Sequence, residues 1–387
     1  MFSRSLSIAT LLLASFASAC SAAPAADDSA TTGEDLSSGP GARATDARAP
    51  ELGGDPTLVN QSQISLADGV AQVTAANGAV VEAKFELADD GKSVSLSIYP
   101  VKNGLGKDSE RNVFQEASGD PTQASWTPDL ATFDDDEHVL RSSRDLTLVQ
   151  LSRIGVGDAI RRSQGMGKVF WTIPTLRNKR AGYGVYALDR HGHQAYKFVD
   201  GQGSDDSTTD CWFGLDEIGP GPGDGATDAR VPELGDDLTI VRQSKVSMAD
   251  ALAQMEAQNG PAIEAKFELA DDGKSLSLSI YPVGKGLALD AERNTFFELS
   301  DDPTAATYAP DKSQFAMPDF EHVSRSARDL TLVQAASLSV REAVDAVNEA
   351  MPDGFVFWVI PTIRDTRAGY GVYTLGKDDK PHYYFVS

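Results

Sequence analysis

One twelve-residue stretch occurs twice in this chain, and its recurrence limits what the chain can fold into. The letters EAKFELADDGKS occupy Glu82–Ser93 and return unchanged at Glu264–Ser275, 182 residues later. The match continues for seven more residues with one difference, Val94 against Leu276. A self-similarity of this length indicates that the chain is assembled from two copies of one structural unit.

The two copies are predicted to span residues 51–200 and 233–387. The spacing between matching positions grows from 182 near Arg48 and Arg230 to 187 near the end of each copy, which places short insertions in loops. Residues 201–232 are rich in Gly, Asp, Ser and Pro and are predicted to form a linker. Each copy divides again, at about 55–126 and 137–200 in the first and at about 237–308 and 321–387 in the second.

Each half combines one amphipathic helix with strictly alternating strands. In the first half, Ser65 is a candidate helix N-cap, and apolar residues follow at helical spacing until Gly78. Residues 81–87 and 93–99 alternate between apolar and polar around an acidic turn that ends at Gly91. One face of this hairpin is apolar, so we expect a helix on it, and water or a second layer on the opposite, polar face.

The second halves repeat this order of elements. Ser339 and Glu342 form a capping box before an apolar helical stripe in the second copy. Strands are predicted at 355–360, 369–375 and 382–386, and at 169–173, 183–188 and 195–199 in the first copy. The predicted fold class is therefore α+β, with two tandem repeats that each pair two units of a helix packed on an antiparallel sheet.

The N-terminus has the features of an export signal. Arg4 supplies a positive charge, residues 6–16 form a short apolar run, and small residues precede Cys20, so residues 1–19 are predicted to be a signal peptide. Cys20 follows directly and resembles the acylated cysteine of a bacterial lipoprotein, although Ala17 stands where such signals carry Leu or Val. Simple cleavage after Ala19 is the alternative. Residues 20–50 are predicted to be a flexible tether, and Cys211 has no expected disulfide partner.

The charge of the chain excludes one large class of partners. It carries 34 Lys plus Arg against 57 Asp plus Glu, a formal net charge of −23. A surface this acidic repels phosphate backbones and anionic lipid headgroups. We therefore expect no nucleic-acid partner, and contact with a membrane only through a lipid anchor at Cys20.

The order of cap, short helix, Gly, alternating strand, acidic-Gly turn and alternating strand resembles the PepSY domain family. The residues that carry the resemblance are Ile64–Val70, Gly78 and Val81–Ile98, then Val246–Ile280, and more loosely Val156–Val199 and Val340–Val386.

PepSY units occur in propeptides of extracellular metallopeptidases, where they are associated with inhibition and folding assistance, and in stand-alone envelope proteins. This chain departs from the propeptide arrangement because the given sequence contains no His-Glu-x-x-His and no peptidase domain follows the repeats. The resemblance therefore implies a non-catalytic binding protein of the bacterial cell envelope, periplasmic, lipid-anchored or extracellular. Inhibition or chaperoning of a secreted peptidase is the expected role.

A cluster of arginines and tyrosines in each copy is the candidate binding site. Arginine forks and tyrosine rings suit a surface that recognises carboxylates or extended peptide. The alternative is that the guanidinium groups pair with the protein's own carboxylates or cap a loop. The candidate residues are Arg177, Arg180, Tyr183 and Tyr186 in the first copy and Arg364, Arg367, Tyr370 and Tyr373 in the second.

Other polar groups give weaker signals. His191 and His193 lie two apart in a predicted turn, and residues 134–138 form an acidic run that ends in His138, but neither supplies a full ligand set. The glycines around Tyr183 follow a strand pattern and do not form a dinucleotide motif. We therefore predict no catalytic residue, no metal and no cofactor. A scaffolding envelope lipoprotein with duplicated modules and a metal-assisted enzyme are the alternative functions.

Overall fold

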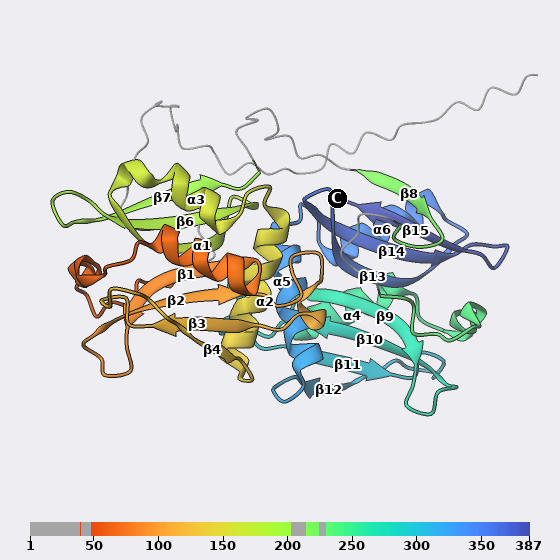
Figure 1. Ribbon diagram of the computed structural model, residues 1–387. Helices are drawn as coiled ribbons and strands as arrows, with labels where there is room; N and C mark the ends of the chain where they lie inside the picture. The colour runs from red at the N-terminus through yellow and green to blue at the C-terminus, as the bar shows by residue number, and fades with distance from the viewer. Residues whose placement is uncertain (1–38, 40–47, 203–213, 224–229) are drawn as a thin grey trace, which may run out of the picture. The chain divides into compact units, whose positions relative to one another are not determined.

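The protein is described from a computed structural model, which defines residue 39 and residues 48–202, 214–223 and 230–387. The predicted signal peptide, most of the predicted tether, Cys20 and Cys211 lie outside this part. The described chain combines α-helices with two antiparallel sheets, as predicted for the α+β class (Figure 1).

The first sheet has seven strands in the order β4-β3-β2-β1-β5-β6-β7. The hairpin predicted from the alternating pattern forms β1 and β2, paired antiparallel with Phe85 opposite Leu96. The central pairing is between β1 and β5, which joins the two halves of the copy into one sheet. The strands are β1 (Val80–Leu87), β2 (Val94–Pro100), β3 (Gln115–Gly119), β4 (Asp129–Thr132), β5 (Lys168–Arg177), β6 (Arg180–Leu188) and β7 (Gln194–Asp200).

The second sheet has eight strands in the order β12-β11-β10-β9-β13-β14-β15-β8. Its eighth strand, β8, lies inside the segment predicted to be a linker and pairs with β15. The strands are β8 (Leu215–Gly219), β9 (Ala262–Leu269), β10 (Leu276–Pro282), β11 (Phe297–Asp301), β12 (Asp311–Gln314), β13 (Phe355–Arg364), β14 (Arg367–Leu375) and β15 (Pro381–Val386).

Two helices cover the apolar face of each sheet. Helix α1 (Leu66–Asn77) begins at the predicted cap, where the Ser65 hydroxyl accepts from the Asp68 amide. Its buried Val70 and Val73 face β1 and β2, while α3 (Val156–Arg162) packs on β5 and β6. Helices α4 (Met248–Asn259) and α6 (Val340–Ala350) occupy the corresponding positions on the second sheet.

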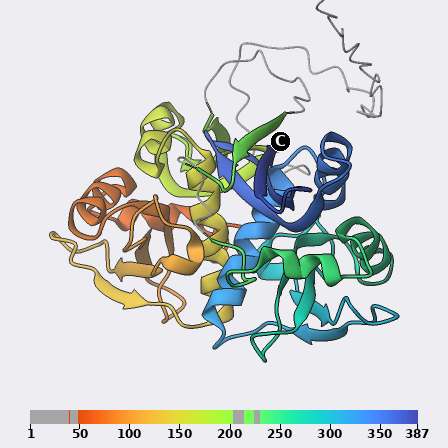
Figure 2. The same ribbon diagram turned by 90° about the vertical axis from the view of Figure 1, so that its right-hand side faces the viewer.

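The polar face of each sheet is covered by a long helix that sequence analysis did not predict. Helix α2 (Asp136–Leu151) packs on β1, β5 and β6, and α5 (Phe320–Ala335) packs on β9, β13 and β14. The two helices also pack against each other, as both views show (Figure 1, Figure 2). Glu82 and Lys84, on the polar face of β1, are therefore buried under a second layer.

Short 3-10 helices complete the described secondary structure. They are η1 (Pro56–Gln61), η2 (Ser109–Arg111), η3 (Gln164–Met166), η4 (Leu238–Gln243) and η5 (Ala291–Arg293). Within the described residues, no helix combines the length and apolar character that crossing a bilayer requires.

Contacts between the two halves of the described chain are reciprocal. At the tip of the β5–β6 hairpin, the Lys179 ammonium donates to the carbonyl oxygen of Ala336, just after α5, over 2.9 Å. At the tip of the β13–β14 hairpin, Thr366 accepts from the Arg153 guanidinium, just after α2, over 3.5 Å. Each hairpin tip therefore lies against the helix end of the other copy.

Candidate functional site

The four candidate tyrosines lie in the hydrophobic core and present no surface for a partner. Tyr183, Tyr186, Tyr370 and Tyr373 are each at most 2% exposed. The Tyr183 hydroxyl donates to the carbonyl of Ile154 over 2.7 Å, and burial raises its pKa well above the ordinary value. The rings are buried because helices cover both faces of these strands: α3 and α2 pack on β6, and α6 and α5 pack on β14.

The candidate arginines lie at the ends of two hairpins, beside the strands β7 and β15. The guanidinium of Arg177 lies over the ring of Phe198 in β7, 5.8 Å from its centroid, and that of Arg367 over Phe385 in β15 at 5.9 Å. Arg180 forms an ion pair with Asp200, at the end of β7. The alternative of pairing with the protein's own carboxylates therefore holds for Arg180.

Arg364 makes the contact that identifies the candidate site. Its Nη1 donates to the carbonyl oxygen of Pro222 over 3.1 Å, and Pro222 belongs to the segment that follows β8. This segment lies outside residues 233–387, the predicted second copy. Arg364 therefore binds the backbone of the segment that follows β8, as expected if it caps a loop.

Strand β8 itself pairs with β15 as a β-strand added to the edge of the second sheet. Tyr384 lies opposite Glu217 and Val386 opposite Leu215 in an antiparallel register. The pairing continues past the strand end, where the amide of Ser387 donates to the carbonyl oxygen of Gly214 over 3.0 Å and the reverse bond is 2.8 Å. We call β15, with the adjoining Ser387, the strand-accepting edge.

Side chains reinforce this backbone pairing. The imidazole Nδ1 of His382 lies 2.7 Å from the carboxylate of Glu217. Leu215 and Ile218 of β8 are partly buried against the hydrophobic core of the second sheet. The edge therefore combines backbone hydrogen bonds with one charged and two apolar contacts, which are the elements of peptide recognition by strand addition.

Glycines in β14 allow the edge to form. A Cβ at Gly371 would lie 2.3 Å from the hydroxyl oxygen of Tyr383 and 2.7 Å from its ring, so this tyrosine of β15 packs directly on the glycine. A Cβ at Gly369 would lie 2.5 Å from the carbonyl of Val386. The glycines around Tyr183, in β6, have the same role towards β7, which explains their strand pattern in physical terms.

Buried ionic clusters lie between each sheet and its long helix, and sequence analysis did not find them. In the first cluster Glu82 of β1 accepts from Nε and Nη2 of Arg141 in α2, over 2.9 and 2.6 Å. It also accepts from the indole nitrogen of Trp171 over 2.8 Å. Asp145 lies 2.8 Å from the guanidinium of Arg144 and 3.2 Å from that of Arg48.

The second cluster reproduces these contacts. Glu264 accepts from Nε of Arg325 over 3.0 Å and from the indole of Trp358 over 2.8 Å. Asp329 lies 2.7 Å from Arg328 and 3.7 Å from Arg230.

One carboxylate from each copy also reaches the cluster of the other. Glu292 lies 3.2 Å from Arg48, and Glu110 lies 3.5 Å from Arg230. These two residues are 182 positions apart, as are the two arginines. The clusters therefore couple the two halves through equivalent residues.

The carboxylates of each cluster have pKa values displaced in opposite directions. Burial by itself would raise the pKa of Glu82, but Arg141 and Arg48 hold it well below its ordinary value of 4.5, and Glu264 behaves alike. Glu82 and Glu264 therefore stabilise the folded chain at pH values above their ordinary pKa of 4.5. This stabilisation is lost as the pH falls below 4.5 towards the pKa that the two groups have in the folded chain.

Burial, with Glu82 adding repulsion, raises the pKa of Asp145 to about 7 despite Arg48 and Arg144, and Asp329 likewise has a pKa of about 7. An aspartate whose pKa is raised on folding stabilises the folded chain fully at pH values below its pKa of 3.8 in the unfolded chain. That contribution is lost as the pH rises to the folded value.

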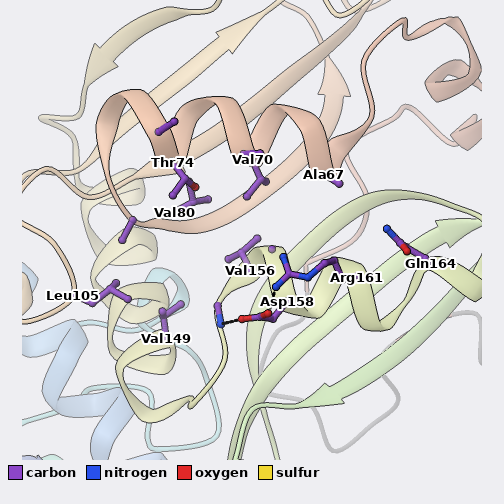
Figure 3. Close-up of a pocket in the computed structure, with 15 residues that line it drawn as sticks. Ala67, Val70, Thr74, Val80, Leu105, Val149, Val156, Asp158, Arg161 and Gln164 are labelled. Carbon is purple, nitrogen blue, oxygen red and sulfur yellow. Dashed lines mark hydrogen bonds and ion pairs between the residues drawn. The ribbon is translucent and has the colours of Figure 1, made fainter.

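An apolar groove of about 680 Å³ opens between α1 and α3 of the first copy (Figure 3). Val70 and Thr74 line one side, and Val156 and Gly157 the other. The second copy carries Glu256 where the first has Thr74, and Arg341 where the first has Gly157. Burial raises the pKa of Glu256, against smaller lowering by the hydrogen bond from the Ala262 amide and by the attraction of Arg341.

The histidines have structural or exposed positions. His138 lies 2.9 Å from the N-cap carboxylate of Asp135 and stacks on Phe133, with ring centroids 4.4 Å apart. The predicted acidic run therefore caps α2. His193 is exposed in its turn, and among the described residues no group of three His, Cys, Asp or Glu side chains has the geometry to hold a metal ion.

Comparison with protein-family models, with curated proteins and with solved structures found no match.

Proposed function

We propose that this chain is an exported, non-catalytic binding protein of PepSY type that holds an extended segment of its partner as an added β-strand. The supporting observation is β8, which comes from outside the second copy and is held on β15 in that way. Backbone pairing and the bond from Arg364 to a carbonyl oxygen supply affinity, and the contact of His382 with an acidic side chain supplies selectivity. The two acidic residues and two aliphatic residues of β8 make acidic, extended peptides the expected ligand class.

The proposal includes an architecture of two tandem repeats, each a pair of PepSY-like units. The identical order of seven strands in the two sheets supports it, as do the equivalent positions of α1 and α4 and of α3 and α6. In this architecture α1 with β1 and β2 forms one unit, and α3 with β5, β6 and β7 forms the next. The strand-accepting edge is then the outer strand of the second unit.

The class of partner follows from the resemblance to PepSY domains. Secreted peptidases are the partners it implies, with inhibition or chaperoning as the effect, in the cell envelope or outside the cell. A lipid anchor at Cys20 is the proposed membrane contact. Mass measurement of the mature N-terminus decides this point, because acylation of Cys20 and cleavage after Ala19 give different masses.

The binding mode is tested with a labelled peptide of residues 214–222. The chain carrying Ile218→Pro loses one apolar contact, and its backbone is fixed at the register shift between Glu217 and Gly219, which weakens its own β8. The peptide should bind this variant at micromolar to millimolar concentration and bind the unchanged chain at least about tenfold more weakly, because the tethered strand competes at high effective concentration. A folded variant that leaves the peptide free throughout this range would exclude strand addition.

A structural or scaffolding role is the second candidate, favoured by the reciprocal contacts between the two halves. The two functions differ in a second assay, in which the purified mature chain is added to a panel of secreted peptidases from the same source. An inhibitor slows at least one of them, and a chaperone increases the yield of active enzyme during refolding. If the chain neither inhibits a peptidase nor aids refolding, and the peptide does not bind, the scaffolding role is the function that remains.

A further inference from the structure

We propose that the outer edge of β4 is a further binding surface, which takes an extended segment of a partner with alternating aliphatic and basic residues. Strand β4 (Asp129–Thr132) ends the first sheet, on the side opposite to β7 (Figure 1). It pairs with β3 on one side, and among the residues that the structure defines no strand pairs with its other side. The inference is independent of the proposed function, which concerns β15.

The register of β4 leaves backbone groups pointing away from the sheet. The Phe133 amide donates to the carbonyl oxygen of Phe114, which directly precedes β3, over 3.1 Å. Bonded and non-bonded pairs alternate along an antiparallel ladder, so Ala131 also bonds towards β3. The N–H and C=O groups of Leu130 and Thr132 therefore point outward, where the backbone of an added strand can bond to them.

The equivalent edge of the second copy has a lysine where β4 has a leucine. Lys312 of β12 stands 182 positions after Leu130. Its ammonium lies 3.9 Å from the ring centroid of Phe297 and 3.4 Å from the amide oxygen of Asn259. A lysine on an edge strand disfavours pairing with a further strand. Leu130 is 47% exposed, so the first copy lacks this protection and offers an apolar side chain in its place.

The exposed leucine lies on the core side of the sheet. Leu130 lies opposite Ala117 of β3, and directly opposite residues share one face of the sheet. Ala117 is buried in the hydrophobic core of the first copy. An aliphatic side chain of an added strand beside Leu130 would therefore extend this core and remove apolar surface from water.

The opposite face of the edge is acidic. Asp129 and Ala131 point to this face, because successive side chains of a strand alternate, and Glu116 of β3 lies opposite Ala131. Asp134, just after the strand, is exposed. Basic side chains of an added strand would meet these carboxylates, and opposite charges on neighbouring strands stabilise their pairing. The edge therefore fits a segment that is aliphatic on one face and basic on the other.

Binding of a labelled peptide tests the edge. The probe is a short peptide that alternates Val with Lys, added to the full chain at about 150 mM salt and followed by fluorescence anisotropy. It should bind with a dissociation constant below about 1 mM. A peptide that alternates Val with Glu should bind at least about tenfold more weakly, because it meets carboxylates of its own sign.

Two matched substitutions separate the edge from the general acidity of the chain. Leu130→Lys gives β4 the residue of the second copy and should weaken binding of the Val–Lys peptide at least about tenfold. Leu105→Lys adds the same charge at another exposed leucine and should change binding less than about twofold. Thr132→Pro removes one outward amide without a change of charge and should weaken binding about fivefold.

Hydrogen exchange tests the backbone pairing itself. The amides of Leu130 and Thr132 should exchange rapidly in the chain alone and become protected when the Val–Lys peptide is bound. The amide of Ala131, which bonds towards β3, should be protected in both states. Lys312→Leu should add a further peptide site at β12.

The outcomes decide the inference without reference to β15. Binding that is weakened in Leu130→Lys and kept in Leu105→Lys, with new protection at Leu130 and Thr132, supports it. The absence of binding up to about 1 mM, equal weakening by both lysine substitutions, or unchanged exchange at the outward amides overturns it. A dimer of the unmodified chain that Leu130→Lys dissociates, with the peptide unbound, would assign the edge to self-association and also overturn the proposal.

Discussion

Replacing Glu82 by Gln tests whether the buried ionic clusters stabilise the protein. The substitution keeps the shape of the side chain but removes the charge that Arg141 and the indole of Trp171 contact. One amide –NH₂ then faces donors where the carboxylate had only acceptors. Arg141, with 6% of its side chain exposed, is left without its bidentate partner.

The structure sets the size of the effect. Breaking a buried pair by removing one partner costs about 3–5 kcal/mol. Glu51 and Glu292 remain 3.6 and 4.0 Å from Arg141, which places the expected loss at the lower end, about 3 kcal/mol. Such a loss is a large part of the stability of an ordinary domain. Glu264→Gln should cost at least as much, since the contacts of Glu264 with Arg325 and Trp358 repeat those of Glu82.

Urea titration followed by tryptophan fluorescence and by circular dichroism measures the loss, and Trp171 reports from inside the cluster. The control is Lys377→Gln, which removes an ion pair whose side chains are 70% and 60% exposed and should cost no more than about 1 kcal/mol. Combining Glu82→Gln with Arg141→Met should cost less than the sum of the single changes, because no unpaired charge remains at that contact. A loss below about 1 kcal/mol for Glu82→Gln would refute the reasoning.

Three further predictions address the edge, a turn and pH. Gly371→Ala should lower the melting temperature and the protection of β15 amides from hydrogen exchange, because its Cβ would clash with Tyr383. Gly157→Ala, whose Cβ would make only ordinary van der Waals contacts, should change neither. Thr366→Gly should raise stability by about 1 kcal/mol, because Thr366 has φ of +63°; a lower melting temperature would contradict this. Stability should fall from about pH 5 to above pH 7 as Asp145 and Asp329 ionise, and Asp145→Asn should reduce that slope.

The hairpins and their covering helices could be predicted from sequence because their pattern is local. Strict alternation from Val81 to Leu87 defined the buried face of β1, and the Ser65 cap defined the start of α1. The capping box at Ser339 was also predicted correctly, since Glu342 accepts from the Ser339 amide over 2.8 Å. These signals depend on neighbouring residues alone.

Helices α2 and α5 escaped prediction because their buried faces are charged. The buried residues of α2 include Arg141, Arg144 and Asp145. A search for apolar residues at helical spacing does not place charged residues on a buried face. Their burial depends on Glu82, which is distant in sequence and visible as a partner only in the folded chain. The repetition of residues 144–150 at 328–334 was the available signal, but repetition does not reveal which groups pair.

The binding role of the candidate residues stays a prediction, and the structure shows where they lie. Arg364 contacts the backbone carbonyl of Pro222 after β8, and Tyr370 is buried because α5 and α6 cover the two faces of its strand. Strand β8 was missed because five residues within a Gly- and Pro-rich stretch carry too short a pattern to distinguish from a linker. Its pairing is decided by β15, which lies more than 160 residues later in the chain.

Hydrogen exchange at residues 214–220 of the unmodified chain tests the strand-accepting edge most directly. The backbone bonds between β8 and β15 predict that amides of Leu215–Gly219 on the bonded side exchange far more slowly than those of the adjoining glycine-rich residues. Leu215–Gly219 exchanging at the rate of an unstructured peptide, while β14 stays protected, would show that β15 holds no added strand.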